Sequence, residues 1–269
     1  MKGQTKPLVS IVMPSFNQQQ FIEEAIQSIV NQDYPNLELI VIDGGSTDGT
    51  LEILKRYDSQ LHWISEPDNG QSHAINKGFK RAQGEIVAWL NSDDFYAPGA
   101  VRTAVDELVN NPDIGAVYGY AGVIDDQGDE THVLKSPEYS RERLFSTPDF
   151  IMQPTVFMRK SVLDQVGLLD ESLHYVMDYD LWLRIGRVTD FKLIPTPLAG
   201  MRFHVDAKSV AQSKKFWPEL RIVYDRYEEI NISRIYRALR NIRLFHALWD
   251  RLRSPRLLRL RDRLFGFKR

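Results

Sequence analysis

The chain has 269 residues, a formal net charge of −2 and no cysteine. This length allows a sizeable core, in one large domain or in one domain with an appendage. The charge gives no reason to expect a nucleic-acid partner, and the absence of cysteine excludes disulfides, thiol nucleophiles and cysteine zinc sites. The apolar run that Pro14 ends is too short for a signal peptide or a membrane span, so we expect a soluble, cytoplasmic protein.

Apolar strands and amphipathic helices alternate through the first hundred residues. Strands are expected at 8–13, 37–42, 61–65 and 86–90, and a run with helical spacing follows each of them. This alternation predicts an α/β fold with a mainly parallel central sheet. Ligands of such sheets lie outside the carboxyl ends of the strands, so the loops at those ends should converge on one cleft.

Polar residues follow three of these strands directly. Asn17 follows the first strand, Asp43 follows the second, and Asn91-Ser92-Asp93-Asp94 follows the fourth. Adjacent carboxylates repel each other and cost desolvation energy when buried, unless a cation lies between them. A divalent metal with oxygen ligands is the simplest partner. The alternative is that these aspartates are exposed loop residues, one of which caps the helix that begins near Pro98.

A glycine-rich loop follows the second strand and contains Gly44, Gly45 and Gly49. Glycine lets the backbone approach a ligand closely, and the N–H groups of such a loop could face a phosphate. The alternative is a glycine-rich turn that binds no ligand.

The second half of the chain is less regular. Strands are expected at 116–120, 153–157, 191–194 and 198–203, and the polar segment 130–150 is expected to be a loop over the cleft. A helix is expected to start at about Leu181, after a loop.

From about Lys214 the pattern becomes helical, amphipathic and, toward the end, rich in arginine. Such a tail could make peripheral contact with an anionic membrane surface. The alternative is that it packs its apolar side on the main domain.

Five motifs occur in a fixed order: VSIVMPSFN, LIVIDGGSTDGT, GEIVAWLNSDD, QPTVF and MDYDLWLR. In combination they resemble family 2 glycosyltransferases of the GT-A fold over about residues 8–210. The resemblance implies a Rossmann-like, three-layer α/β/α catalytic domain over 1–212, with a nucleotide-binding half at about 8–100 and an acceptor-binding half at about 101–212. Residues 213–269 would form a C-terminal helical extension.

The activity that the resemblance implies is inverting, metal-dependent transfer of a sugar from a nucleotide diphosphate sugar, with a UDP-sugar favoured, to a carbohydrate or lipid-linked acceptor. Asp43 matches the aspartate that accepts a hydrogen bond from the nucleotide base. The other positions that match donor-binding residues are Pro14, Ser15, Asn17, Gly45, Ser72, Asn91 and Ser92.

Asp93 matches the last residue of the family's DXD motif, which holds Mn²⁺ or Mg²⁺ on the donor diphosphate. The first position of the motif is Asn91, which brings no charge, and Asp94 is a secondary candidate ligand. His204 matches a downstream position where the family often has a further metal or diphosphate ligand. A lone histidine is also compatible with a structural role.

Asp178 matches the second residue of the family's Glu-Asp pair and is the implied general base for the acceptor hydroxyl. The usual glutamate before it is replaced by Met177. Asp180 and Trp182 follow within about one helical turn, as secondary site residues or as a helix cap and a core side chain.

A second interpretation is a non-catalytic nucleotide-sugar binder or a scaffolding subunit of a larger synthase, since the departures at Asn91 and Met177 could weaken catalysis. By resemblance, the biological setting would be assembly of cell-surface polysaccharide or glycolipid, with the protein at the inner face of the plasma membrane. One fold hosts many functions, so this setting is an analogy.

Overall fold

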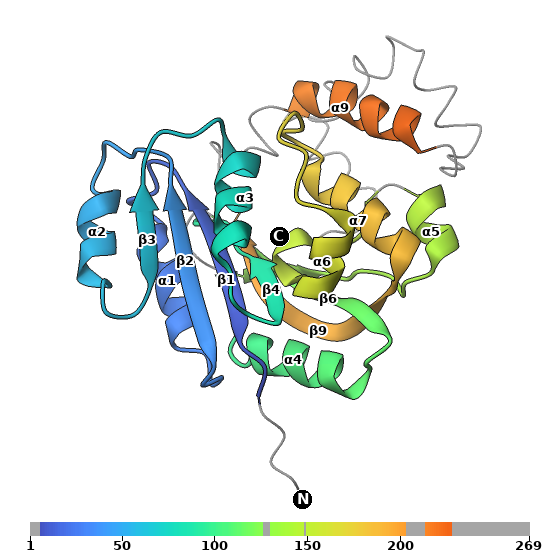
Figure 1. The fold of residues 1–269 in the computed structure, drawn as a ribbon, viewed down its shortest axis with the longest axis horizontal. Coiled ribbons are helices and arrows are strands. Elements are labelled where there is room, and N and C mark those ends of the chain that lie inside the picture. The colour runs from blue at the N-terminus through green and yellow to red at the C-terminus, as the bar shows by residue number, and fades with distance from the viewer. Residues whose placement is uncertain (1–5, 126–129, 148, 203–212, 228–269) are drawn as a thin grey trace, which may run out of the picture.

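The computed structural model describes residues 6–125, 130–147, 149–202 and 213–227 (Figure 1). The elements in chain order are β1 (Val9–Ser15), α1 (Ile22–Val30), β2 (Leu37–Asp43), α2 (Thr50–Arg56), β3 (His62–Ser65), α3 (Gln71–Arg81), β4 (Ile86–Trp89), β5 (Phe95–Tyr96), α4 (Ala100–Asn110), β6 (Ile114–Ile124), β7 (Glu130–Leu134), α5 (Arg141–Ser146), the 3₁₀ turn η1 (Gln153–Thr155), β8 (Phe157–Arg159), α6 (Lys160–Val166), α7 (Met177–Val188), β9 (Asp190–Arg202) and α9 (Ser213–Arg226).

One sheet runs through the domain in the order β3-β2-β1-β4-β8-β6-β9-β5, with β7 paired to β6. The first four strands, β1 to β4, pair in parallel with one another, as expected. The second half is mixed, because β8 is antiparallel to both β4 and β6, whereas β9 is parallel to β6. The α/β fold class is confirmed.

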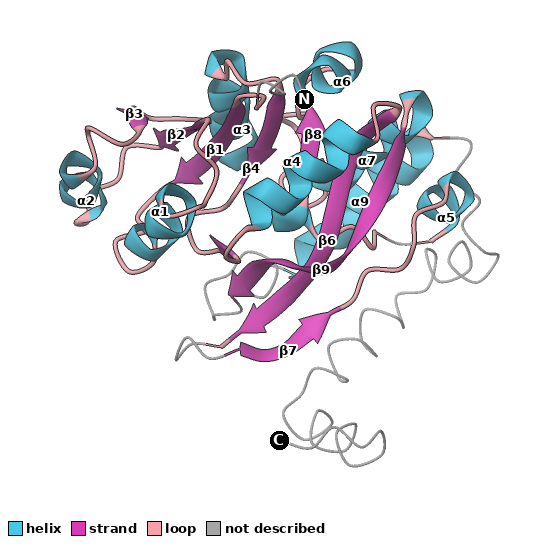
Figure 2. Ribbon diagram, turned by 90° about the horizontal axis from the view of Figure 1, so that it is seen from below, coloured by secondary structure: helices cyan, strands magenta, loops and turns pink. Residues whose placement is uncertain are grey.

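Side chains of β1 alternate between two apolar layers, one on each face of the sheet. Ile11 and Met13 pack in a cluster with α1, α2 and α4, and Val12 packs in another with α3 and α7. Helices therefore cover both faces of the sheet, in three layers (Figure 2). In the described part of the chain, no helix is long and apolar enough to cross a bilayer.

Four predictions for the second half were wrong in detail. The expected loop at 130–150 contains β7 and α5, since β7 gains its structure by pairing with the long strand β6 and α5 is capped by the Ser140 hydroxyl. The expected strand 153–157 begins with η1, and the two expected last strands are one strand, β9, with an irregular register. Helix α7 begins at Met177 rather than Leu181.

Two indole rings connect the strand before the Asp93 loop with the helix that carries Asp178. Trp89 of β4 stacks on Trp182 of α7, with ring centroids 5.4 Å apart and an interplanar angle of 20°. Both side chains are fully buried, and Trp182 also meets Phe191 of β9 edge to face. The alternative that Trp182 is a core residue is the one the structure supports.

Candidate active site

The loops after β1, β2 and β3 meet at one edge of the sheet. The register places Ser15 opposite Asp43, and Asp43 opposite Ser65. Asp43 is fully buried, and its carboxylate accepts hydrogen bonds from the backbone N–H groups of Gly45 and Ser46 at 3.1 and 2.8 Å. It also accepts from the hydroxyls of Ser46 and Ser65, at 2.5 and 2.7 Å. Three of these donors bond Oδ2 and one, the Ser46 hydroxyl, bonds Oδ1, so Asp43 organises the loop, and its expected contact with the nucleotide base stays a prediction.

The glycine N–H groups that were expected to face a phosphate are used within the protein. Gly44 donates to the Ser15 carbonyl at 2.8 Å, Gly45 to Asp43, and Gly49 to the side-chain oxygen of Gln19 at 2.9 Å. The Gly45 N–H group is thus bonded within the loop, and a role of Gly45 in nucleotide binding stays a prediction. Its φ of +87° instead explains why glycine stands in this turn.

Gly44 has a different function, which is to leave room for the turn after β3. A Cβ atom at Gly44 would lie 2.9 Å from a carboxylate oxygen of Asp68 and 3.3 Å from the ring of Phe16. Phe16 is 59% exposed and Asp68 is partly exposed. An exposed aromatic ring and a carboxylate therefore lie together over the second strand's loop, and sequence reasoning missed both of them.

Residues at the end of β1 and just after it adjoin this loop. Asn17 has φ of +53°, donates its N–H to the Ser46 hydroxyl at 2.7 Å, and accepts from the Thr47 N–H at 2.9 Å. Pro14 is buried, and the buried Ser15 hydroxyl has no hydrogen-bond partner within the described part of the chain. Asn17 thus links the first two loops, in addition to any contact with a donor.

A network of neutral amides holds Asn91 after β4. Asn91 accepts a hydrogen bond from the Gln71 amide at 2.7 Å and donates to the Gln153 side chain at 3.2 Å. Gln153 in turn donates to the Trp89 carbonyl at 2.9 Å. Ser92 beside it is buried. The QPTVF motif therefore supplies a positioning side chain to the Asn91 loop, a role that its strand-like pattern did not indicate.

The two adjacent aspartates have different environments. Asp94 is buried, accepts from the Arg202 N–H at 3.1 Å, and has its pKa raised well above the usual range by burial and by the charge of Asp93. Asp93 is partly exposed, and its backbone carbonyl accepts from the Arg202 side chain at 3.3 Å. Asp94 therefore ties its loop to the end of β9, and the metal-ligand roles expected of Asp93 and Asp94 stay predictions.

Asp93 fits a divalent ion as a single protein ligand. His204 lies outside the described residues, and among those that are described no three His, Asp or Glu side chains are grouped to hold a metal. Mg²⁺ is commonly bound by one or two carboxylates together with substrate phosphates and water. Such a site needs no cluster of protein ligands.

Asp178 lies in the first turn of α7 and accepts a hydrogen bond from the next N–H, of Tyr179, at 2.8 Å. A second carboxylate lies close to it in the segment before η1. The pKa of Asp149 is raised well above its usual range, first by burial and then by the charge of Asp178. The charge of Asp178 therefore acts on Asp149, in a site where Met177 replaces the usual glutamate, and sequence reasoning missed Asp149.

Asp149 makes the stability of the fold depend on pH. Because its pKa is raised, the folded state binds more protons than the unfolded chain, so the free energy of unfolding falls as pH rises from the unfolded value of about 4 through the folded pKa. We expect Asp149→Asn to flatten this fall, measured by denaturant titration at a series of pH values. Asp94 contributes a slope of the same sign, which the variant retains. Equal slopes in the variant and the parent would contradict the assignment.

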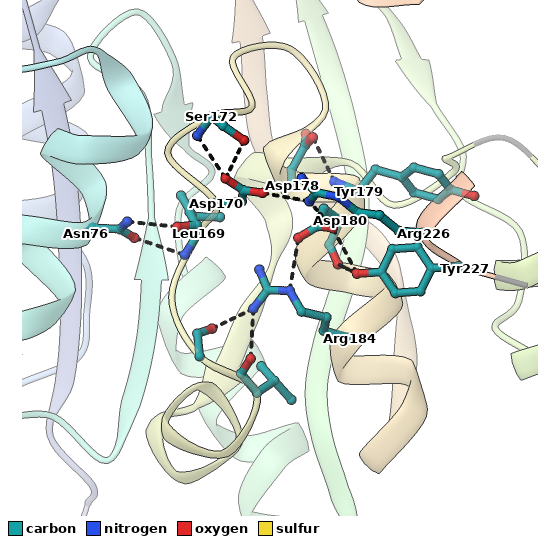
Figure 3. A network of polar contacts seen from close by, with 12 residues as sticks. Asn76, Leu169, Asp170, Ser172, Asp178, Tyr179, Asp180, Arg184, Arg226 and Tyr227 are labelled. Atoms are coloured by element: carbon teal, nitrogen blue, oxygen red, sulfur yellow. Dashed lines mark hydrogen bonds and ion pairs between the residues drawn. The ribbon is translucent and has the colours of Figure 1, made fainter. Parts of the chain in front are cut away.

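Two further candidates have structural contacts instead. Ser72, expected to bind nucleotide, is buried and donates its hydroxyl to the Leu173 carbonyl at 2.8 Å. Asp180 is buried and accepts hydrogen bonds from Arg184 at 3.0 Å and from the Tyr227 hydroxyl at 2.8 Å (Figure 3). Both side chains therefore hold segments of the fold together.

The contacts of Gln71 and Ser72 bring the two halves of the site to the start of α3. Gln71 bonds Asn91, and the next residue bonds Leu173 in the loop that leads to Asp178. The Asp93 loop and the loop before Asp178, which are far apart in the sequence, are therefore both bonded to the start of α3. This is an arrangement in which a donor phosphate and an acceptor hydroxyl could be brought together.

Comparison with known proteins agrees with this geometry. A family model described as glycosyl transferase family 2 matches residues 10–167. The chain is 33% identical over 213 residues to an uncharacterized glycosyltransferase of Rickettsia typhi, with 76% of this chain and 67% of that protein covered. It is 32% identical over 192 residues to the chondroitin synthase of Escherichia coli, with 70% of this chain but 28% of that enzyme covered. The chain thus spans about two thirds of the length of the first relative and less than a third of the length of the second.

Solved structures show the same fold. TarS from S. aureus in complex with UDP-GlcNAc has a TM-score of 0.64 and 18% identity, over 80% of this chain and 65% of that chain. The mannosyltransferase PcManGT from Pyrobaculum calidifontis, in complex with GDP-Man and Mn²⁺, has a TM-score of 0.64 and 24% identity, over 82% and 64%. With the family match over more than half of its length, the chain belongs to glycosyl transferase family 2 and has the GT-A fold.

Proposed function

We propose that this chain is an inverting, metal-dependent glycosyltransferase that moves a hexose from a nucleotide diphosphate sugar, with a UDP-sugar favoured, to a hydroxyl acceptor. The observation that carries the proposal is the pair of contacts at the start of α3, Gln71 with Asn91 and Ser72 with Leu173, which anchors the Asp93 loop and the Asp178 loop to one place. The complexes of TarS with UDP-GlcNAc and of PcManGT with GDP-Man and Mn²⁺ support the class of donor and the metal.

In this proposal Asp178 takes the proton from the acceptor hydroxyl while that oxygen attacks the anomeric carbon. The bond from the anomeric carbon to the diphosphate breaks on the opposite face, so a single displacement inverts the centre. A divalent ion held by Asp93, when bound, supplies positive charge that stabilises the departing diphosphate. The raised pKa of Asp149 disfavours a second negative charge beside Asp178, so in this proposal Asp178 carries the charge of the pair.

For the nucleotide base we propose Asp68 and Phe16 in place of Asp43. Asp43 is fully buried and three donors bond its Oδ2, whereas Asp68 is a partly exposed carboxylate over the same loop. A carboxylate can accept the ring N–H of uracil, and the exposed Phe16 ring offers a surface on which the base can stack.

The chondroitin synthase and the putative teichuronic acid biosynthesis glycosyltransferase among the relatives support a proposal of cell-surface polysaccharide or glycolipid assembly. The acceptor would be a carbohydrate or a lipid-linked sugar, and the protein would act at the inner face of the plasma membrane. The alternative of a non-catalytic nucleotide-sugar binder predicts donor binding without transfer.

A thermal-shift screen of UDP, UDP-sugars and GDP-sugars, with and without Mn²⁺, tests the donor and the metal together. Since a ligand at about 100 times its Kd stabilises the folded state by about 2.7 kcal/mol, we expect a UDP-sugar to raise Tm clearly, and more with Mn²⁺ than without. In the Asp93→Asn variant, Mn²⁺ should no longer add to the rise in Tm that the UDP-sugar gives.

The matched control is Asp164→Asn on α6, whose side chain is 61% exposed. It should keep the metal increment in full. If Mn²⁺ still added to the rise in Tm of the Asp93→Asn variant, Asp93 would not be a metal ligand. Binding of the donor without transfer to any acceptor or to water would favour the non-catalytic alternative.

A further inference from the structure

Helix α9 packs on the domain through its apolar side. Leu220 and Val223 of α9, and Tyr227 just after it, are buried in the same apolar cluster as Tyr179 and Trp182 of α7. The helix lies beside the start of α7 in Figure 1. Of the two alternatives considered for the tail, packing on the domain is the one observed for residues 213–227.

The polar contacts of α9 reach the loop that leads into Asp178. The Glu219 carboxylate accepts hydrogen bonds from two successive backbone N–H groups of this loop, those of His174 and Tyr175, at 2.8 and 2.6 Å. Arg226 forms an ion pair with Asp170 at 2.6 Å. Both ends of the loop are therefore held by side chains of one helix.

Asp180 extends this contact into α7 itself. Its carboxylate is bonded by Tyr227 at 2.8 Å, by Arg226 at 3.4 Å and by Arg184 at 3.0 Å (Figure 3). Because Asp180 is two residues after Asp178 in the first turn of α7, a displacement of α9 would be transmitted to the helix start that carries the general base. A buried carboxylate that loses its cationic partners is costly, so the contact is not readily broken.

Helix α3 holds the opposite side of the same loop. The Asn76 side chain donates to the Leu169 carbonyl at 2.9 Å and accepts from the Leu169 N–H at 3.0 Å, and Ser72 donates to Leu173. The loop 169–176 is therefore fixed between α3, which belongs to the donor side, and α9.

We propose that α9 is a positioning element of the transfer reaction, in which Glu219 and Arg226 hold the loop 169–176 so that Asp178 meets the acceptor hydroxyl. The proposal rests on the proposed role of Asp178. A general base must come within hydrogen-bond reach of its proton, and a displacement of about 1 Å can cost about 100-fold in rate. The catalytic unit then extends at least to Tyr227, beyond the expected boundary at 212.

The test is Glu219→Gln in the full chain, with steady-state kinetics and donor-induced thermal shifts. The amide weakens the two backbone contacts while keeping the size of the side chain, so we expect kcat to fall about 10- to 100-fold. The donor KM and the shift given by UDP with Mn²⁺ should stay within about twofold, because the Glu219 hydrogen bonds in the described part of the chain go to His174 and Tyr175. Glu219→Asp should recover part of the rate.

Asp225→Asn is the matched control, since Asp225 lies on the same helix with a side chain that is 54% exposed. It should keep the kcat of the parent. Tyr227→Phe, which removes only the hydroxyl bonded to Asp180, is the second variant should Glu219→Gln fail to fold, and it should also lower kcat without raising the donor KM.

Three results separate the proposals. An unchanged kcat in both Glu219→Gln and Tyr227→Phe overturns the positioning role. A rise in the donor KM in place of a fall in kcat overturns it as well. An Asp178→Asn variant with normal turnover overturns the proposed function instead, whatever the α9 variants do. If both proposals hold, Glu219→Gln should cause no further loss in the Asp178→Asn background, because the base it positions is absent.

Discussion

Asp178→Asn is expected to lower the rate of sugar transfer by about 100- to 10,000-fold, the range that a positioned general base contributes. The amide cannot take the acceptor proton at neutral pH. It can still accept the Tyr179 N–H that Asp178 accepts at 2.8 Å, so the start of α7 should be retained. Steady-state transfer kinetics and UDP binding by calorimetry, on the same preparation, give the two quantities: transfer should be lost and the Kd for UDP should change by less than about twofold.

The neighbouring Asp149 provides the critical comparison. It lies close enough to Asp178 for the two charges to influence each other, so either carboxylate could in principle carry the proton during turnover. We expect Asp149→Asn to retain most of the activity, because a protonated aspartic acid and asparagine are both neutral. If Asp149→Asn abolished transfer while Asp178→Asn did not, the roles of the two residues would be exchanged.

The first half of the fold was predictable because its strands are buried on both faces. Such strands are short apolar runs, and each is followed by a helix whose buried side chains recur at three- and four-residue spacing, as Ile22, Ala25, Ile26 and Ile29 do in α1. The second half was less predictable because β7 and β8 depend on pairing with β6, which is distant from β8 in sequence. Local pattern contains no information on such a partner.

The candidate site was predicted by loop but less well by side chain. The spacing identified the loops after β1, β2 and β4, and the structure brings the first two together by the contacts of Asn17. It could not show that the Ser65 hydroxyl bonds Asp43, or that Asp94 faces Arg202, because these partners come from other segments. Asp68 and Asp149 were missed for the same reason, since each becomes relevant only through a residue remote in sequence.

Asp43→Ala should unfold the protein at a much lower denaturant concentration, with a loss of at least about 3 kcal/mol in the free energy of unfolding. Truncation leaves the Gly45 and Ser46 N–H groups and the Ser65 hydroxyl without their buried acceptor. Each unsatisfied buried donor costs about 1 to 3 kcal/mol. Denaturant unfolding followed by circular dichroism measures the loss, and Asp43→Asn, which keeps one acceptor oxygen, should lose less.

Asp68→Ala, unlike Asp43→Ala, should weaken UDP binding strongly and lower the free energy of unfolding only slightly. Asp68 is partly exposed and accepts one hydrogen bond, from the Gly70 N–H at 2.7 Å, so we expect a loss of only about 1 kcal/mol in stability. Removing a charge-assisted contact to the base should raise the Kd for UDP by about 10- to 100-fold, and Phe16→Ala should raise it through lost stacking. If instead Asp43→Asn folded with the stability of the parent and lost UDP affinity, while Asp68→Ala bound UDP normally, the base would contact Asp43 as the family resemblance implies.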